Sequence, residues 1–177
     1  SAQTGQDVTW SASWTGGLGP YTYKWLSDSG STNTNNTSAS KTVSYSSSGN
    51  KPESIVITST DNQDITKSCG SVTISYPTIT GSCSADKSTA TTGETVAWRA
   101  NNIGGGSGTY TYAWGGTNSL SCSGQPSAGC NSVAKTYCSN GDKSATVTVT
   151  SGGVNTDFSC TNSSGGSRVT VYNPTLT

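Results

Sequence analysis

The chain carries the same pattern of residues twice, and this repetition constrains its fold more than any other feature. The matching segments are Thr4–Trp10 with Thr92–Trp98, Tyr21–Trp25 with Tyr110–Trp114, and Ile55–Ser59 with Val147–Ser151. The spacing between the copies drifts only from 88 residues (98 − 10) to 92 residues (149 − 57). A repeat of this length can hold its own core. We therefore predict two tandem domains, residues 1–77 and residues 81–174.

Each copy has the period of half-buried β-strands. Apolar side chains alternate with Ser and Thr at Val8, Trp10, Ala12 and Trp14, and no segment has a helical period with capping residues. With only 29% hydrophobic residues in the chain, this alternation is what distinguishes it from a disordered sequence. The pattern predicts an all-β fold of two immunoglobulin-like β-sandwiches with about seven short strands each.

Local pairing and loops can also be predicted. The strands at residues 8–14 and 21–25 flank the turn Gly16–Pro20, which predicts a hairpin between them. Residues 26–40 consist almost entirely of Ser, Asn, Thr, Asp and Gly, which is typical of an exposed loop or a weak edge strand. Residues 77–80 contain Pro and a β-branched residue and should form a short, semi-rigid joint.

Charge and composition exclude several classes of function. Nine basic and nine acidic residues give no net charge, which speaks against nucleic acid as a partner. No segment is apolar enough to insert into a membrane. The chain has no His, so it lacks the usual proton shuttle and the commonest metal ligand. Six Cys and a surface rich in Ser and Thr indicate an oxidising, extracellular location.

The landmarks of the second copy resemble the PKD family of immunoglobulin-like domains. The residues that carry the resemblance are Gly93–Val96, Gly104-Gly105, Tyr110–Trp114, Lys135–Tyr137 and Ala145–Val149. The copy is also similar to a Cys-containing version of this domain that is repeated in bacterial cell-surface proteins. The chain departs from the family after Trp25 and Trp114, where the Trp-x-Phe-Gly-Asp-Gly turn is absent. The resemblance implies a spacer, stalk or adhesive module.

The resemblance also places a cysteine in the first strand and another near the last strand, here Cys83 and Cys160, which we expect to form a disulfide. Cys122 and Cys130 flank a flexible turn and form our second predicted pair. Cys69 and Cys138 would then be unpaired or bonded outside this chain. A metal site is not expected, because the chain has neither His nor a Cys-x-x-Cys motif.

Cys69 corresponds to Cys160, and the counterpart of Cys83 would lie five positions ahead of Ser1 (83 − 88). We therefore expect the first strand of copy one to be missing from this chain, which would leave an open edge in its sandwich. Two sources for that strand remain: another part of the same polypeptide, or a neighbouring subunit whose tail, Tyr172–Thr177, fills the place.

Few residues are candidates for a site. Trp14 is the best exposed candidate for stacking on a sugar. Asn35, Asn36 and Asn162 begin glycosylation sequons, which chance alone also produces in so Ser/Thr-rich a chain. Asp61 and Asp64 share one turn and could bind calcium, but copy two keeps only one acid there, which favours a solvated turn.

Two functional hypotheses follow. The first is a non-catalytic structural module of an extracellular surface protein, stalk or filament, with neighbouring domains or subunits as partners. The second is a module that binds glycans or proteins, on an adhesin or beside a secreted enzyme. An enzyme is not expected, because no Ser or carboxylate has the partners that would activate it. No cofactor is expected either.

Overall fold

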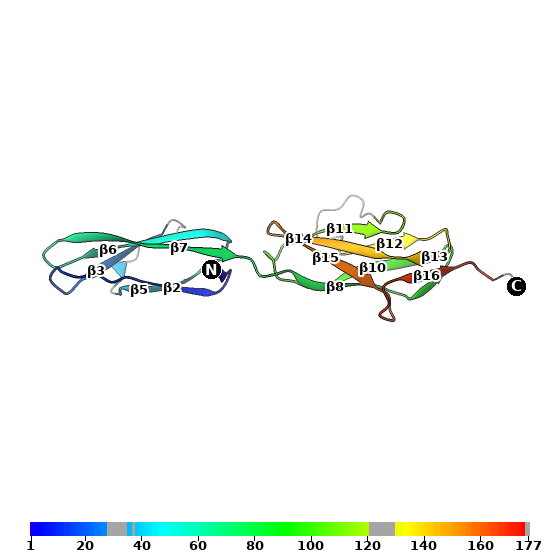
Figure 1. Cartoon of the computed structure of the whole chain (residues 1–177), viewed down its shortest axis with the longest axis horizontal. Coiled ribbons are helices and arrows are strands. Elements are labelled where there is room, and N and C mark those ends of the chain that lie inside the picture. Colours follow the sequence, from blue (N-terminus) through cyan, green and yellow to red (C-terminus); the bar gives the residue numbers. More distant parts are fainter. Residues whose placement is uncertain (28–34, 37, 121–129, 176–177) are drawn as a thin grey trace. The chain divides into compact units, whose positions relative to one another are not determined.

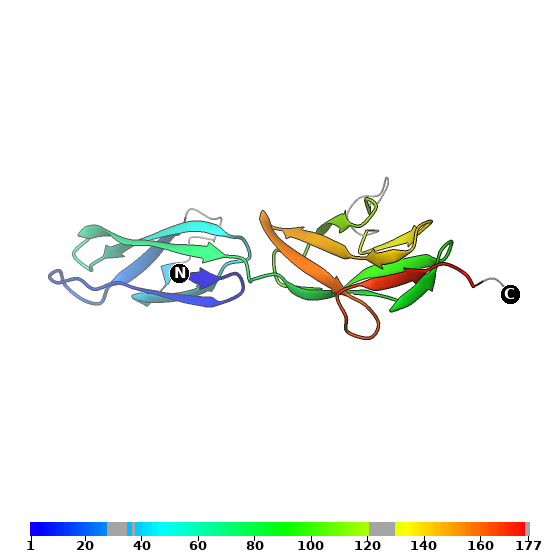
Figure 2. The same cartoon turned by 45° about the vertical axis from the view of Figure 1, so that its right-hand side comes forward.

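A computed structural model describes residues 1–27, 35–36, 38–120 and 130–175. The chain divides into two compact units, unit 1 (Ser1–Tyr76) and unit 2 (Pro77–Thr177). Every regular element in the described residues is a β-strand. The predicted all-β fold of immunoglobulin-like β-sandwiches is confirmed, and Figures 1 and 2 show the strands of each unit.

Unit 1 contains seven strands in two sheets. The strands are β1 (Ala2–Gln3), β2 (Asp7–Ser11), β3 (Thr22–Ser27), β4 (Asn35–Asn36), β5 (Ser40–Ser44), β6 (Gly49–Thr58) and β7 (Asp64–Ser75). One sheet has the order β1-β7-β6-β3-β4, and the other consists of β2 and β5. The core between them contains Trp10, Trp25, Ile55 and Ile57, which are all buried.

Unit 2 repeats this arrangement with nine strands in its described residues. Its strands are β8 (Thr80–Ala85), β9 (Thr89–Thr91), β10 (Thr95–Gly104), β11 (Thr111–Gly116), β12 (Ser132–Thr136), β13 (Gly141–Lys143), β14 (Ala145–Ser151), β15 (Val154–Thr161) and β16 (Val169–Tyr172). They form one sheet in the order β11-β14-β15-β8-β10-β12 and another in the order β13-β16-β9. The long strands β6 and β7 of unit 1 each take the place of two strands here.

The strand β8 lies in the middle of the six-stranded sheet of unit 2, between β15 and β10. It pairs antiparallel with β10, where Cys83 faces Ala100, and parallel with β15, where Cys83 faces Cys160. Unit 1 has no strand in this place among its described residues, so β2 and β5 stay separate from the five-stranded sheet. Residues 1–3 do not supply it, because β1 pairs with the end of β7 as β9 pairs with β16.

The predicted hairpin between the strands at residues 8–14 and 21–25 is wrong. β2 pairs with β5, and β3 pairs with β6 and β4. The Gly-rich loop between β2 and β3 instead carries the chain from one sheet to the other. Alternation shows that a strand has one buried face, but it does not show which strand lies at its edge.

Each unit contains the same pair of polar contacts in its own interior. Trp10 donates its indole N–H to the Tyr45 hydroxyl at 3.2 Å, and Trp98 donates to Tyr137 at the same distance. A lysine ammonium lies over each of these tyrosine rings, 5.9 Å from the centroid in unit 1 and 5.6 Å in unit 2. The sequence repeat is therefore a repeat of buried polar contacts as well as of apolar positions.

Candidate functional site

A disulfide links Cys83 on β8 to Cys160 on β15, the pairing that the family resemblance implied. The two Cα atoms are 4.3 Å apart, and both residues are buried in the core of unit 2. The bond closes a loop between residues separated by 77 positions. It links β8 covalently to β15, its neighbour in the six-stranded sheet.

The other cysteines differ from one another. Cys130 is buried and disulfide-bonded, while Cys122, its predicted partner, lies outside the described residues. Cys69 and Cys138 are free thiols. Cys138 is exposed, whereas Cys69 lies on β7 and packs against the core cluster of unit 1. Burial, and to a lesser extent the nearby charge of Glu53, raises the pKa of the Cys69 thiol.

These surroundings predict that the two free thiols react at different rates. Because the thiolate is the nucleophile, we expect iodoacetamide at neutral pH to modify Cys138 about ten times faster than Cys69. The difference should narrow as the pH rises and Cys69 loses its proton. Peptide mass spectrometry on the native protein would measure both rates, with Cys69→Ser and Cys138→Ser variants to assign them. Equal rates at neutral pH would contradict the half-buried position of Cys69.

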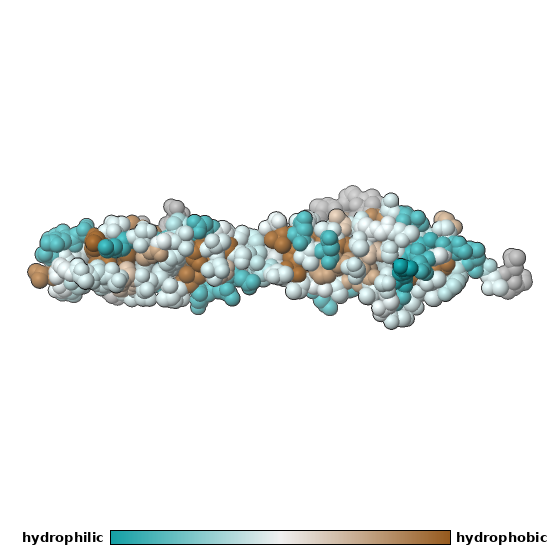
Figure 3. Space-filling model, in the orientation of Figure 1, coloured by the Kyte–Doolittle hydropathy of each residue, from teal (hydrophilic) through white to brown (hydrophobic). Residues whose placement is uncertain are grey.

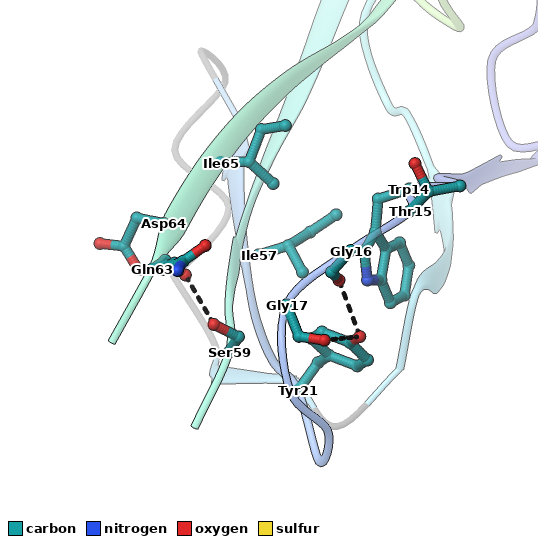
Figure 4. A pocket seen from close by; sticks show the side chains of 10 residues that line it. All are labelled: Trp14, Thr15, Gly16, Gly17, Tyr21, Ile57, Ser59, Gln63, Asp64 and Ile65. Carbon is teal, nitrogen blue, oxygen red and sulfur yellow. Dashed lines mark hydrogen bonds between the residues drawn. The ribbon is translucent and has the colours of Figure 1, made fainter. Parts of the chain in front are cut away.

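A hollow of functional interest lies at one end of unit 1, beside Trp14. It has a volume of about 220 Å³. In Figure 4 the Trp14 and Tyr21 rings lie on one side of it, and Ile57 and Ile65 on the other. A second hollow continues from it between residues 13–15 and β7, lined by Trp14, Ile65 and Lys67. The lining mixes apolar and polar residues, and Ile65 is 40% exposed there.

Trp14 is less exposed than we predicted. Its ring meets Tyr21 and Tyr23 in edge-to-face contacts, with centroids 5.2 and 5.3 Å apart. The Tyr21 hydroxyl in turn donates to the carbonyl oxygens of Gly16 and Gly17. Alternation along the strand could not anticipate these contacts, because they depend on how the loop returns over the sheet. A role for Trp14 in stacking on sugars stays a prediction.

The candidate sequons lie in different surroundings. Asn35 and Asn36 form β4 and pair with β3. The Asn162 side chain holds its own loop closed. Its amide donates to the carbonyl oxygen of Arg168, and its oxygen accepts the N–H groups of Ser164 and Gly166, both at 2.9 Å. Glycosylation of Asn162 stays a prediction, but a glycan on that amide nitrogen would compete with the bond to Arg168.

Carboxylates in the described residues serve the fold. Asp61 accepts a hydrogen bond from Ser59 in the turn between β6 and β7. Thr91, through its backbone N–H and then its hydroxyl, lowers the pKa of Glu94, with Lys87 adding to the effect. Hydrogen bonds from Thr170 and then Arg168 lower the pKa of Asp142. Among the residues that the structure describes, no group of three or more Cys, Asp or Glu could hold a metal ion.

The surface that faces the viewer in Figure 3 is mostly pale, the colour of residues of intermediate hydropathy such as Ser and Thr. Strands alternate buried residues with such polar ones, as β14 does. In the described part of the chain, no helix is long and apolar enough to cross a membrane. What unit 1 offers chemically is the free Cys69 thiol and a hollow with a mixed polar and apolar lining.

No protein-family model matches the chain, and no curated protein is similar to it in sequence. Solved structures of tandem β-domains are similar in fold. Fibronectin(III)-like modules of Clostridium thermocellum CbhA share 13% identity at a TM-score of 0.36, covering 97% of this chain and 88% of theirs. The titin domains Z1Z2, solved in complex with telethonin, share 12% identity at a TM-score of 0.46, covering 98% and 91%.

SGBP-B of the Bacteroides ovatus mixed-linkage glucan utilization locus, solved in complex with a mixed-linkage heptasaccharide, is similar over 96% of this chain and 42% of its own length. The identity is 12% and the TM-score 0.33. At such identities and TM-scores these likenesses concern the general fold, and they carry no argument about ligands or partners.

Proposed function

We propose that the chain is a non-catalytic, PKD-type structural module of an extracellular surface protein, stalk or filament. The observation that carries the proposal is the Cys83–Cys160 disulfide across the core of unit 2. A structural disulfide of this kind persists in oxidising surroundings and is rare in the cytosol. A module that only extends a surface protein needs a stable core and a polar exterior. The buried polar side chains Trp10, Tyr45, Trp98 and Tyr137 form hydrogen bonds within the two cores and so support their stability.

The position of the disulfide suits a part that is held under tension. If unit 2 is pulled from its two ends, the segment between Cys83 and Cys160, which are 77 positions apart, cannot extend until the disulfide is reduced. Fully extended, that segment would add about 260 Å. The bond therefore limits how far unit 2 can stretch, which a linker without such a bond would not do.

The proposal is tested on the native source of the protein. An antibody raised against the chain should label an extracellular surface layer or polymer in electron micrographs. Mass spectrometry of the labelled fraction should find the chain's peptides together with neighbouring domains or subunits. Recovery of the chain only as a free monomer in the medium, or inside the cell, would overturn the proposal. A peptidase-shaved sample in which surface labelling is lost serves as the control for location.

A further inference from the structure

The two units can be compared position by position, because they share the same pattern of strands. In unit 2, β8 lies between β10 and β15, and its Cys83 bonds to Cys160. In unit 1 the corresponding strands are β2 and β7. Within the described residues, β2 pairs with β5 alone, so its other edge carries no strand. An open edge presents unpaired backbone N–H and C=O groups, which is a template for strand addition.

The hollow beside Trp14 lies where unit 2 has a side chain. In unit 2 the residue just ahead of β8, Ile79, is 3% exposed and belongs to the core. A Cβ built on Gly106 would meet Ser151 and, at 3.4 Å, Ile79 Cγ1. Gly17 has the same relation to Ser59, with a Cβ-to-Cβ distance of 3.0 Å. Both Gly17 and Ser59 line the hollow.

The second hollow continues along the path that β8 follows in unit 2. It is bounded by Ser13, Trp14 and Thr15 on one side and by Ile65 and Lys67 of β7 on the other. β8 lies between the same two elements of unit 2, reaching the end of β10 where Thr80 faces Gly104. The two hollows of unit 1 together follow the segment from Ile79 into β8.

The free thiol lies at the end of this path. Cys69 on β7 corresponds to Cys160 on β15, and it is half-buried against the Trp10 cluster. In unit 2, Cys83 faces Ala100 on β10, and the counterpart of Ala100 in unit 1 is Ala12, which directly follows β2. A strand that entered beside Ala12 would therefore bring its own cysteine to Cys69.

We propose that a cysteine-bearing strand of the same polypeptide, of the sequence type of Ile79–Ala85, completes unit 1 between β2 and β7 and bonds to Cys69. The strand runs antiparallel to β2 and parallel to β7. An apolar residue four positions ahead of its cysteine fills the hollow beside Trp14. Bond formation oxidises the two thiols to one disulfide and passes two electrons and two protons to an oxidant, for which oxidised glutathione is sufficient.

The choice of the same polypeptide rests on how unit 2 is connected. β8 ends at Ala85 and β9 begins at Thr89, with three residues between them. β1 holds the place of β9 in unit 1, pairing in parallel with the end of β7. The C-terminal end of a strand between β2 and β7 would therefore lie close to the start of β1, so that a short connection could join them as residues 86–88 join β8 to β9. The proposal goes beyond the structural role above and does not depend on it.

The first experiment offers the strand as a synthetic peptide with the sequence of residues 77–87, PTITGSCSADK. It is added to the intact chain carrying Cys138→Ser, in a glutathione redox buffer, and the adduct is followed by mass spectrometry. We expect the peptide to bond to Cys69 at least about ten times faster than a scrambled peptide that keeps its cysteine, a factor equal to about 1.4 kcal/mol in the activation free energy. Equal rates for the two peptides, or no adduct, would overturn the proposal.

Two further readouts test the geometry. Replacing the peptide's isoleucine with serine should remove most of its advantage, because the hollow beside Trp14 would then hold a polar side chain. Hydrogen exchange at Ser11, at Ser13 and at residues 69–70 should slow in the adduct, since both edges become paired. Exchange at Ala12 should not change, because its N–H already donates to the Ala39 carbonyl oxygen. Unchanged exchange at both edges would overturn the proposal even if an adduct forms. A glycan array gives one further test. If a glycan bound through Trp14 and still bound to the adduct, the peptide would not occupy the hollow, and the proposal would be overturned.

The second experiment identifies the source of the strand. Protein taken from its native source is digested without reduction, and the peptide that contains Cys69 is analysed by mass spectrometry. We expect it to be linked to a cysteine of the same polypeptide, so that reduction leaves a single polypeptide whose mass rises only by two hydrogens for each disulfide opened. Separation into two polypeptides on reduction would overturn the assignment to the same chain, and a free Cys69 in the native protein would overturn the disulfide.

Discussion

Replacing both Cys83 and Cys160 with alanine is expected to lower the free energy of unfolding of unit 2 by about 4–5 kcal/mol, since the bond closes a loop of 77 positions. The loss arises mainly because the unfolded chain regains the freedom that the bond denied it. A loss of this size is a large share of the stability of an ordinary domain. Urea unfolding followed by tryptophan fluorescence would measure it. The double variant is preferred to reduction, which would also open the bond at Cys130.

The matched control is Cys138→Ala, which removes an exposed free thiol from the same unit. We expect it to change the stability by no more than about 0.5 kcal/mol. A double variant that lost no more than this control would show that the bond does not stabilise unit 2, and it would remove the main support for the proposed structural role.

Replacing Trp98 with alanine is expected to destabilise unit 2 by about 3–5 kcal/mol. The side chain is fully buried, and the change also leaves the Tyr137 hydroxyl without the indole that donates to it. The transition of unit 1 should stay in place, because distant sites with no shared partners behave additively. Circular dichroism and fluorescence during denaturation would separate the two transitions.

Trp10→Ala provides the matched comparison in unit 1. Trp10 makes the same hydrogen bond to Tyr45, but the residue is 8% exposed, while Trp98 is 0% exposed. We therefore expect a smaller loss in unit 1 than in unit 2. If Trp98→Ala shifted both transitions equally, the two units could not be separate folding units, and the repeat would have to be read as one cooperative structure.

The class of fold and the positions of the core can be predicted from the local pattern of residues. Alternation marks Trp10 and Trp98 as inward-facing, and both are buried. It also marks Val147 and Val149, which are fully buried on β14. These predictions succeed because a strand's two faces alternate residue by residue, so burial of one face leaves a pattern that local sequence carries. The Cys83–Cys160 bond was anticipated through a family resemblance and not through spacing.

The pairing of the strands, and the strand edges that stay unpaired, can be seen only in the folded units. The loop after β2 crosses to the other sheet instead of closing a hairpin, and it turns Trp14 toward Tyr21 and Tyr23. The hollow that results is lined by residues far apart in the chain, such as Gly17 and Ile65. Pairing and cavities depend on contacts between distant segments, and a local pattern does not record them because each strand shows the same alternation whichever partner lies at its edge.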